Sequence, residues 1–165
     1  MQPEQKRFLE KRYDAPAWQG HNKHGKRVVK GFCFDKDELA GWTLHRQHEK
    51  SGKPPAIRSL WHRGDATKSL LAIDLFECSS VDAALDQLIE VLGNVQSNAV
   101  ERRTGKNAPG EVTFGLGETM VLFSRANIVV FIRNAGPKVA RVAEIAQALD
   151  ASIVRRLEAK QKDKE

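Results

Sequence analysis

Residues 119–133 read Thr-Met-Val-Leu-Phe-Ser-Arg-Ala-Asn-Ile-Val-Val-Phe-Ile-Arg, and this stretch decides the fold. It holds two apolar runs rich in β-branched and aromatic residues, which are typical of strands. The short polar interruption between the runs is typical of a hairpin turn, in which Asn127 is able to take a positive φ. The stretch therefore predicts an antiparallel hairpin of residues 119–124 and 128–133.

A second strong strand signal lies upstream, in residues 69–78. Apolar side chains there fall on both parities, which indicates a strand that is covered on both faces and lies near the centre of the sheet. Shorter or weaker runs predict four further strands, at residues 42–49, 56–63, 98–103 and 111–115, and a β-rich, strand-like run at residues 28–34 begins the domain. The Gly- and Pro-containing loop 50–55 predicts that residues 42–49 and 56–63 form a hairpin.

Two segments predict amphipathic helices. Ser79 or Ser80 supplies the N-cap, apolar residues follow at helical spacing as far as Leu92, and Gly93 occupies the C-cap position. The second helix is expected to begin at Pro137, a residue type favoured in the first helical turn, and to extend to Arg156.

The order of these elements is several strands, a helix, four strands and a helix. Antiparallel hairpins with both helices on one face of the sheet satisfy this order most simply. The sequence therefore predicts an α+β fold, with an antiparallel sheet of about six to seven strands and two amphipathic helices packed on it.

This arrangement resembles the PsbP/Mog1-like domains, which include small exported lipoproteins. The resemblance lies in the paired strands, the helix that leaves a central strand, the hairpin Met120 to Arg133 and the closing Ala-rich helix, and it covers roughly residues 28–154. It implies a noncatalytic accessory or binding domain, often outside the cytoplasm.

The net charge of +6 is concentrated at the two ends of the chain. Residues 1–30 hold eight Lys or Arg against three acids and residues 155–165 hold five against three, whereas residues 31–154 are nearly neutral. We therefore expect a basic N-terminal arm at 1–27, a single domain at 28–156 and a charged tail at 157–165. The arm is expected to be ordered only where Phe8, Leu9, Tyr13 or Trp18 meets a core.

No stretch approaches the roughly 18 consecutive apolar residues that a membrane-spanning helix needs, so we expect no such helix.

The sequence contains two cysteines, Cys33 and Cys78, each beside phenylalanine in a strand-like run. We expect two buried free thiols that act as small hydrophobes. The alternative is a disulfide between two strands, which would imply an oxidising compartment.

No signal peptide is visible at the start. Two hypotheses stay open: a cytoplasmic protein, or an exported one whose signal peptide is absent from this sequence.

Metal and cofactor signals are weak. The pair His21 and His24 lies among lysines that would oppose a cation, and His45 and His48 would point to opposite faces of a strand. No glycine pattern has the strand, loop and helix context of a phosphate cradle. We therefore expect neither a metal nor a cofactor.

Four polar residues near the predicted central strands are the candidates for catalysis. They are His62, Asp65, Asp74 and Glu77. None belongs to a recognisable motif that supplies a nucleophile with its base or a pair of carboxylates. No catalytic residue is assigned, and a small enzyme of unknown reaction is the weakest of three hypotheses.

The most distinctive local feature is the basic stretch Trp42 to Arg63. Its acid is Glu49, and it carries two tryptophans, three histidines and several cations. The candidate binding residues within it are Trp42, Arg46, Arg58, Trp61, His62 and Arg63. As a positive hairpin with exposed rings, it would bind phosphates and stack bases of RNA or contact another polyanion. The simpler interpretation is that both tryptophans are core anchors and the charges face solvent.

Three functions therefore stay open. The leading hypothesis is a noncatalytic accessory or interaction domain that binds a protein partner or ligand through a sheet face or loop rim. The alternatives are an RNA- or polyanion-binding protein that uses the basic hairpin, which we favour less, and the small enzyme named above.

Overall fold

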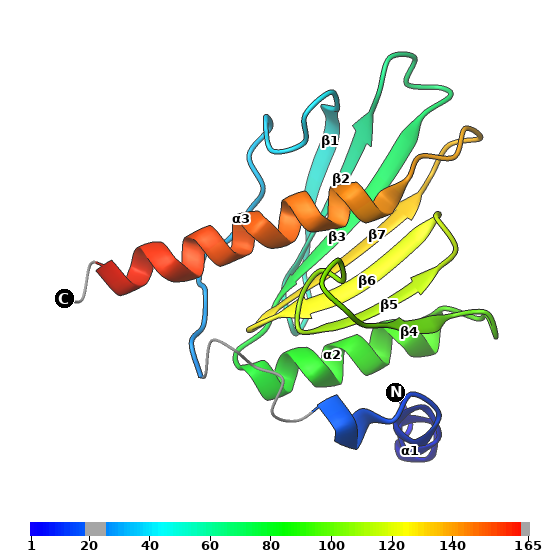
Figure 1. The fold of residues 1–165 in the computed structure, drawn as a ribbon, viewed down its shortest axis with the longest axis vertical. Helices are drawn as coiled ribbons and strands as arrows, with labels where there is room; N and C mark the ends of the chain where they lie inside the picture. The colour runs from blue at the N-terminus through cyan, green and yellow to red at the C-terminus, as the bar shows by residue number, and fades with distance from the viewer. Residues whose placement is uncertain (19–25, 163–165) are drawn as a thin grey trace.

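The fold is an antiparallel sheet between two helical layers (Figure 1). The computed structural model describes residues 1–18 and 26–162. The described elements, in chain order, are α1 (Pro3–Arg12), the 3-10 turn η1 (Ala15–Trp18), β1 (Thr43–Lys50), β2 (Ala56–His62), β3 (Leu70–Glu77), α2 (Val81–Asn94), β4 (Glu101–Arg103), β5 (Val112–Leu116), β6 (Met120–Arg125), β7 (Ile128–Asn134) and α3 (Val142–Lys162). This confirms the α+β class with helices packed on an antiparallel sheet.

The seven described strands lie in the order β1-β2-β3-β7-β6-β5-β4, and every pairing is antiparallel. The expected hairpin β6–β7 joins the two halves of the sheet, because β7 also pairs with β3. The strand β7, rather than β3, therefore occupies the central position. Both strands contribute side chains to the cores on both faces of the sheet, as their largely apolar runs predict.

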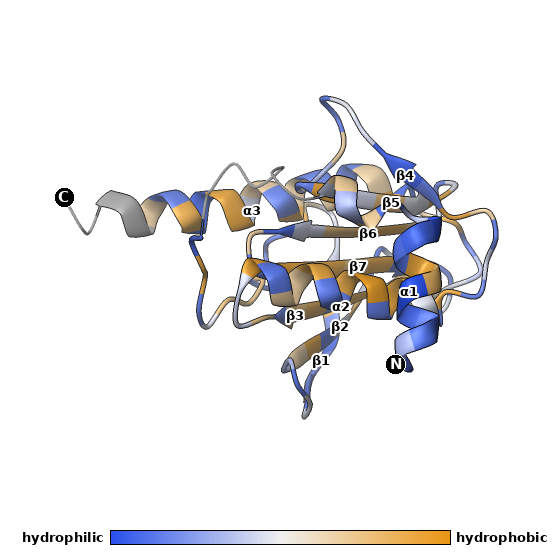
Figure 2. Cartoon of the chain, turned by 90° about the horizontal axis from the view of Figure 1, so that it is seen from below, coloured by the Kyte–Doolittle hydropathy of each residue, from blue (hydrophilic) through white to orange (hydrophobic). Residues whose placement is uncertain are grey.

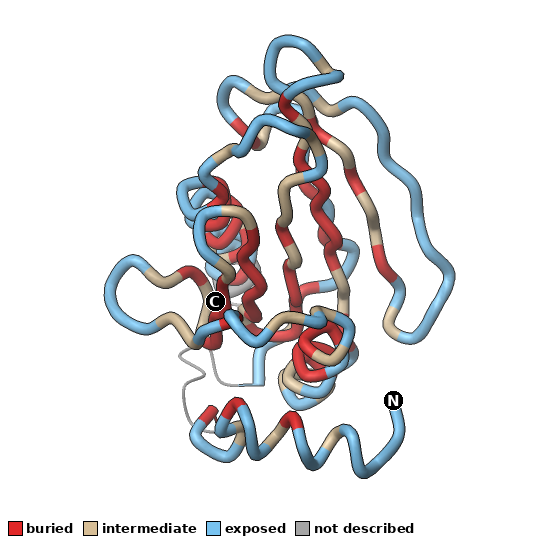
Figure 3. Tube along the Cα trace, turned by 90° about the vertical axis from the view of Figure 1, so that its right-hand side faces the viewer, coloured by how far each residue is buried: buried red, intermediate tan, exposed pale blue. Residues whose placement is uncertain are grey.

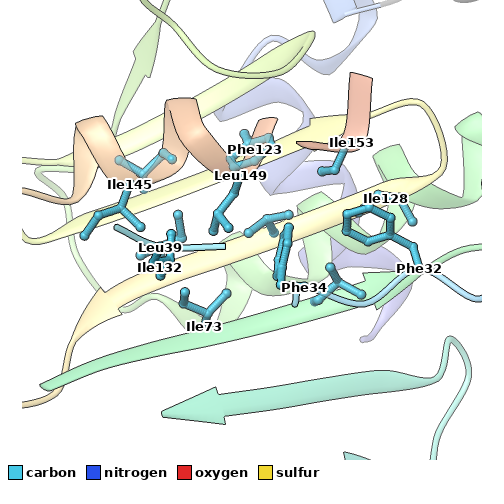
Figure 4. Packing of buried hydrophobic residues seen from close by; sticks show 14 of the residues in the cluster. Phe32, Phe34, Leu39, Ile73, Phe123, Ile128, Ile132, Ile145, Leu149 and Ile153 are labelled. Carbon is cyan, nitrogen blue, oxygen red and sulfur yellow. The ribbon is translucent and has the colours of Figure 1, made fainter. Parts of the chain in front are cut away.

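Side chains alternate between the two faces of the sheet, and each face has its own core. The first core contains Ile73, Phe123, Ile128 and Ile132 of the sheet together with Ile145, Leu149 and Ile153 of α3, and Figure 4 shows these side chains interleaved. The second core contains sheet residues of the other parity, such as Leu122 and Val129, packed against Leu88 and Leu92 of α2. The two helices therefore lie on opposite faces. The expectation that both pack on one face was wrong, because each face of the central strands is apolar and needs its own cover.

The N-terminal segment belongs to the second core. Leu9, Tyr13 and Trp18 are buried there, and the rings of Tyr13 and Trp18 lie 5.1 and 5.3 Å from that of Phe114 on β5. Phe8, by contrast, is 62% exposed. Figure 2 shows α1 and α2 together over this face. The arm is thus ordered through three of the four residues that were expected to anchor it.

The helix α2 comes close to α1 at Gly93. A Cβ at this position would lie 3.0 Å from Leu9 Cδ1. The N-cap is Ser80, one of the two expected candidates, and its hydroxyl accepts a hydrogen bond from the Ala83 amide at 3.1 Å. The prediction that Gly93 is the C-cap was wrong, because the helix continues to Asn94 and Val95 is its C-cap. The glycine leaves room for the neighbouring helix instead.

Residues 28–34 form no strand, which corrects a second prediction. Their apolar side chains are nevertheless buried, because Val29, Phe32 and Phe34 belong to the core beneath α3. A side chain from another segment, rather than a neighbouring strand, bonds this backbone. Asn127 Oδ1 accepts a hydrogen bond from the Val29 N–H at 2.7 Å, and Asn127 Nδ2 donates one to the Val29 carbonyl oxygen at 2.9 Å.

The turn of the β6–β7 hairpin also differs in detail from the prediction. The positive φ belongs to Ala126, at 51°, and not to Asn127. The Ala126 amide donates to Glu111 Oε2 at 3.0 Å. The Asn127 side chain is held by its bonds to Val29 and by another to Cys78 O at 2.7 Å. Ala126, the first residue of the turn, takes the left-handed conformation instead.

The closing helix α3 begins later and ends later than predicted. Residues before Val142 are held as a loop, in which the Asn134 side chain bonds both the amide and the carbonyl of Ala140. The helix then runs to Lys162, and Leu157 is only 2% exposed. The helix therefore continues past Arg156, where it was expected to end, and buries Leu157.

Candidate functional site on the uncovered sheet face

The β1–β2 hairpin extends beyond the helices that cover the middle of the sheet (Figure 2). The close sheet neighbours of α2 are β3, β6 and β7, and those of α3 are β6 and β7. On the α2 side, the face of β1 and β2 is thus left open. We call this surface, together with the adjoining parts of β3 and β7, the cationic face, and define it by Arg46, His48, Lys50, Arg58, His62 and Arg133.

Strand register brings these side chains together in rows. His48 pairs with Arg58, which pairs with Asp74, which pairs with Phe131. In the next row Arg46 pairs with Leu60, Leu60 with Ala72, and Ala72 with Arg133. Residues directly opposite each other have Cβ atoms about 5 Å apart. Side chains from residues far apart in the sequence therefore form one surface.

A buried carboxylate lies in the middle of this face. Asp74 has a side chain only 6% exposed, and it accepts bonds from Arg58 Nε and Nη2 at 2.5 and 2.7 Å and from Arg133 Nη1 at 3.0 Å. Burial raises the pKa of Asp74, but the hydrogen bonds from the two arginines outweigh it, so the pKa lies below its usual value. The bond to Asp74 likewise raises the pKa of Arg58. The ion cluster is fixed in its charged form.

The surrounding side chains are partly exposed and positioned by ring contacts. The Arg133 guanidinium lies 4.8 Å from the centroid of the Phe131 ring, a cation–π distance. The rings of His45 and His62 meet edge to face at 5.7 Å, and His62 Nδ1 lies 2.9 Å from the Gly64 carbonyl oxygen. Arg58 and Arg133 keep 30% and 31% of their side chains exposed. Their guanidinium groups are therefore held in place with surface still open to a ligand.

The face is strongly positive even though residues 31–154 are nearly neutral as a whole. Four of its residues are Lys or Arg, and Asp74 offsets one of them. Glu49, the acid of β1, has the opposite parity and pairs with Ile57 of the α3-side core. Because side chains alternate along β1, its basic side chains and its carboxylate lie on opposite sides of the hairpin. The open side is therefore positive and attracts anions.

The structure divides the six residues proposed from the sequence among three places. Arg46, Arg58 and His62 meet on the cationic face. Trp61 is fully buried in the core beneath α3, with its Nε1 donating to Ser59 Oγ at 2.9 Å. Trp42 and Arg63 border another hollow.

That hollow has a volume of about 650 Å³ and lies where the chain enters α3. Its lining includes Lys138, Arg141 and Glu144 beside the half-buried Trp42. Another cavity, of about 540 Å³, lies between the flank of α2 and the loop before β2. Its lining carries both lysines and carboxylates, so neither cavity selects a ligand of one charge as clearly as the open face does.

Sequence reasoning missed Arg133 and gave Asp74 no partner. Arg133 lies 59 residues after Asp74, and only the β3–β7 register brings the two together. The alternation of β2 was a usable signal, because Arg58 and His62 share a parity that Trp61 does not. His48 and Lys50 share the parity of Arg46 in the same way.

The four candidates for catalysis are engaged in structural contacts. Asp74 is held by two arginines, and Glu77 Oε2 accepts the Phe32 amide at 2.9 Å. Asp65 accepts bonds from the Thr67 amide and hydroxyl, which lower its pKa. His62 lies against Gly64 O. These contacts give each group a role in the fold.

Both cysteines are free. Cys33 is exposed, which corrects the expectation that both are buried, and Cys78 is buried. Burial, together with the charge of Glu77, raises the pKa of Cys78 to about 12. The alternative of a disulfide between them was wrong.

Among the side chains that the structure describes, no three His, Cys, Asp or Glu residues come together as they would around a metal ion. The pair His21 and His24 lies outside the described residues. None of the helices in residues 1–18 and 26–162 combines the length and apolar character needed to cross a membrane.

The fold and the site together define an α+β sandwich with an open, positively charged sheet face. Comparisons with protein-family models, with curated proteins and with solved structures gave no match to this chain. The resemblance to PsbP/Mog1-like domains stays a prediction, and function is argued from the chain's own residues.

Proposed function

We propose that this chain is a noncatalytic interaction domain that binds an acidic protein partner through the cationic face. The observation that carries the proposal is the gathering of Arg46, Lys50, Arg58 and Arg133 on the part of the sheet that the helices leave open. Such a surface steers an oppositely charged partner and fixes its register. The two arginines that hold Asp74 are already ordered, so less conformational entropy is lost when they bind.

The positions of the tryptophans favour a protein partner over RNA. Binding of single-stranded nucleic acid combines cations with exposed aromatic rings on which bases stack. Trp61 is buried and Trp42 borders a different hollow, so neither ring accompanies the arginines. The predicted resemblance to accessory domains agrees with a protein partner. Binding of RNA is kept as an outcome of the test.

The test uses two variants with the same change in net charge on opposite sides of β1. Arg46→Gln removes a positive charge from the cationic face. Gln47→Glu adds a negative charge on the other parity, where Gln47 pairs with Ser59. Polyglutamate is the protein-like probe and an unstructured single-stranded RNA is the comparison. Affinity is measured by fluorescence anisotropy at low and high salt.

We expect the wild-type chain to bind polyglutamate at low salt. Arg46→Gln should weaken this binding about fivefold, and Gln47→Glu should change it little. Equal effects of the two variants would show that net charge alone acts. Preference for RNA over polyglutamate would favour the nucleic-acid hypothesis instead. Turnover in a broad hydrolase screen that is lost on changing Asp74 or His62 would overturn the noncatalytic assignment.

A further inference from the structure

The strand β1 has an open outer edge. It is the last strand of the sheet on its side and pairs only with β2 among the described strands. Seven of its eight residues are exposed, and Figure 3 shows it as an exposed strand at the margin of the sheet. In such an edge strand, the N–H and C=O groups of alternate residues point away from the sheet. No backbone hydrogen bond from the described residues covers them.

The side chains of this edge carry an alternating charge pattern. Arg46, His48 and Lys50 share the parity of the cationic face, and Gln47 and Glu49 share the other. An extended segment added beside β1 would place every second side chain opposite Arg46, His48 and Lys50, with Cβ atoms about 5 Å apart. Acidic residues at alternate positions of that segment would match them.

The same pattern opposes pairing with a second copy of the chain. In an antiparallel pairing of two β1 strands related by two-fold symmetry, residues that face each other share the same side of the joined sheet. Arg46, His48 and Lys50 of one copy would therefore face the same three residues of the other. Like charges directly opposite each other destabilise a sheet. The charge pattern of β1 therefore opposes pairing with a second β1 strand but not pairing with an acidic strand.

We infer that an extended acidic segment of the partner protein adds to β1 as a further strand, with its carboxylates opposite Arg46, His48 and Lys50. This inference rests on the proposed function and specifies how the acidic partner binds. Main-chain hydrogen bonds to the edge would supply affinity, and the alternate carboxylates would supply specificity. A partner of this kind needs no folded surface, only a segment about as long as β1.

Synthetic peptides test the inference on the full chain. The first peptide has glutamate at alternate positions with threonine and valine between them, and it matches β1 in length. The second has the same composition, with the glutamates scrambled so that they fall on both faces of a strand. Two further versions of the first peptide carry N-methyl groups on alternate amides, in the two possible registers, because N-methylation removes a hydrogen-bond donor and keeps the charge.

We expect the alternating peptide to bind at least about tenfold more tightly than the scrambled one. One N-methylated version should lose binding and the other should keep it, because only alternate amides face β1. Amide hydrogen exchange should slow in β1 when the alternating peptide is bound. Arg46→Gln should weaken the binding, and Gln47→Glu should not.

Two results would overturn the inference in distinguishable ways. If both N-methylated versions bind as well as the parent while Arg46→Gln still weakens binding, strand addition is wrong and the proposed function stands. If no acidic peptide binds at low salt and Arg46→Gln has no effect, both are wrong.

Discussion

The guanidinium of Arg58 holds both carboxylate oxygens of Asp74, at 2.5 and 2.7 Å, in the middle of the open face. Arg133 adds a third bond from a strand on the other side of β3. A single buried carboxylate thus orders two of the cations that we assign to binding. It also offsets part of their charge, so stability and ligand affinity oppose each other at this residue.

Asp74→Asn should lower the free energy of unfolding by about 2 kcal/mol, because two arginines lose a charged partner. The same change should strengthen binding of polyglutamate, since the face gains one unit of positive charge. Urea unfolding and fluorescence anisotropy measure the two effects. Asp65→Asn, in an exposed turn, is the matched control and should change both quantities less. A loss of polyglutamate affinity in folded Asp74→Asn would contradict the account.

Acid should weaken the wild-type fold through the same carboxylate. The pKa of Asp74 is depressed in the folded state relative to about 3.9 in an unfolded chain. Its contribution to stability is therefore complete above the unfolded pKa and is lost as the pH falls through the folded one. Between about pH 5 and 2, Asp74→Asn should lose less stability than wild type. Parallel pH profiles for the two proteins would contradict this prediction.

The Asn127 side chain should be essential to the segment that precedes β1. Asn127→Ala would leave the amide and carbonyl of Val29 and the carbonyl of Cys78 without their partner, at a cost of about 3 kcal/mol. The Val29 amide should then exchange its hydrogen much faster. Asn98→Ala, at an exposed position, should cost less than about 0.5 kcal/mol. Unchanged exchange at Val29 would show that other contacts hold the segment.

The N-terminal helix should contribute to stability through Leu9. Leu9→Ala removes a side chain that is 6% exposed and packs in the core beneath α2, and we expect a loss of about 2 kcal/mol. The neighbouring Phe8, at 62% exposure, provides the control, since Phe8→Ala should change stability little. Thermal or urea unfolding of both variants measures the difference. Equal effects would mean that α1 does not pack as described.

The two thiols should differ sharply in reactivity. Cys33 is exposed and should react with a thiol reagent in the folded protein. Cys78 should react only on unfolding, because burial and a pKa raised to about 12 keep it as a thiol. Mass spectrometry of the labelled chain should show one adduct before denaturation and two after it. Rapid labelling of folded Cys33→Ser would contradict the buried position of Cys78.

Much of the fold could be predicted because its strongest signals are local. The apolar runs of β3, β6 and β7 and the capped helical repeat of α2 each lie within one short segment. Residues 28–34 were mistaken for a strand because burial and β-propensity alone do not show whether a ladder partner exists. The buried roles of Leu9, Tyr13 and Trp18 depended on a surface formed by α2 and β5, which no local pattern reports.

The site was predictable in part. Alternation along β2 separates Arg58 and His62 from Trp61, so the two sides of the hairpin could have been distinguished. The contribution of Arg133 depends on the β3–β7 register, and the opening of the face depends on where α2 stops covering the sheet. Both are tertiary properties, which is why the tryptophans and arginines were grouped into one site that the structure divides.

We propose that the cationic face, and not the basic chain ends, binds the acidic partner. A titration of the isotopically labelled full chain with the alternating acidic peptide, followed by amide chemical shifts, distinguishes these two surfaces. We predict the largest shifts in β1 and at Arg58, Asp74 and Arg133. Shifts confined to α1 and the last turns of α3, with β1 and β2 unchanged, would contradict the account.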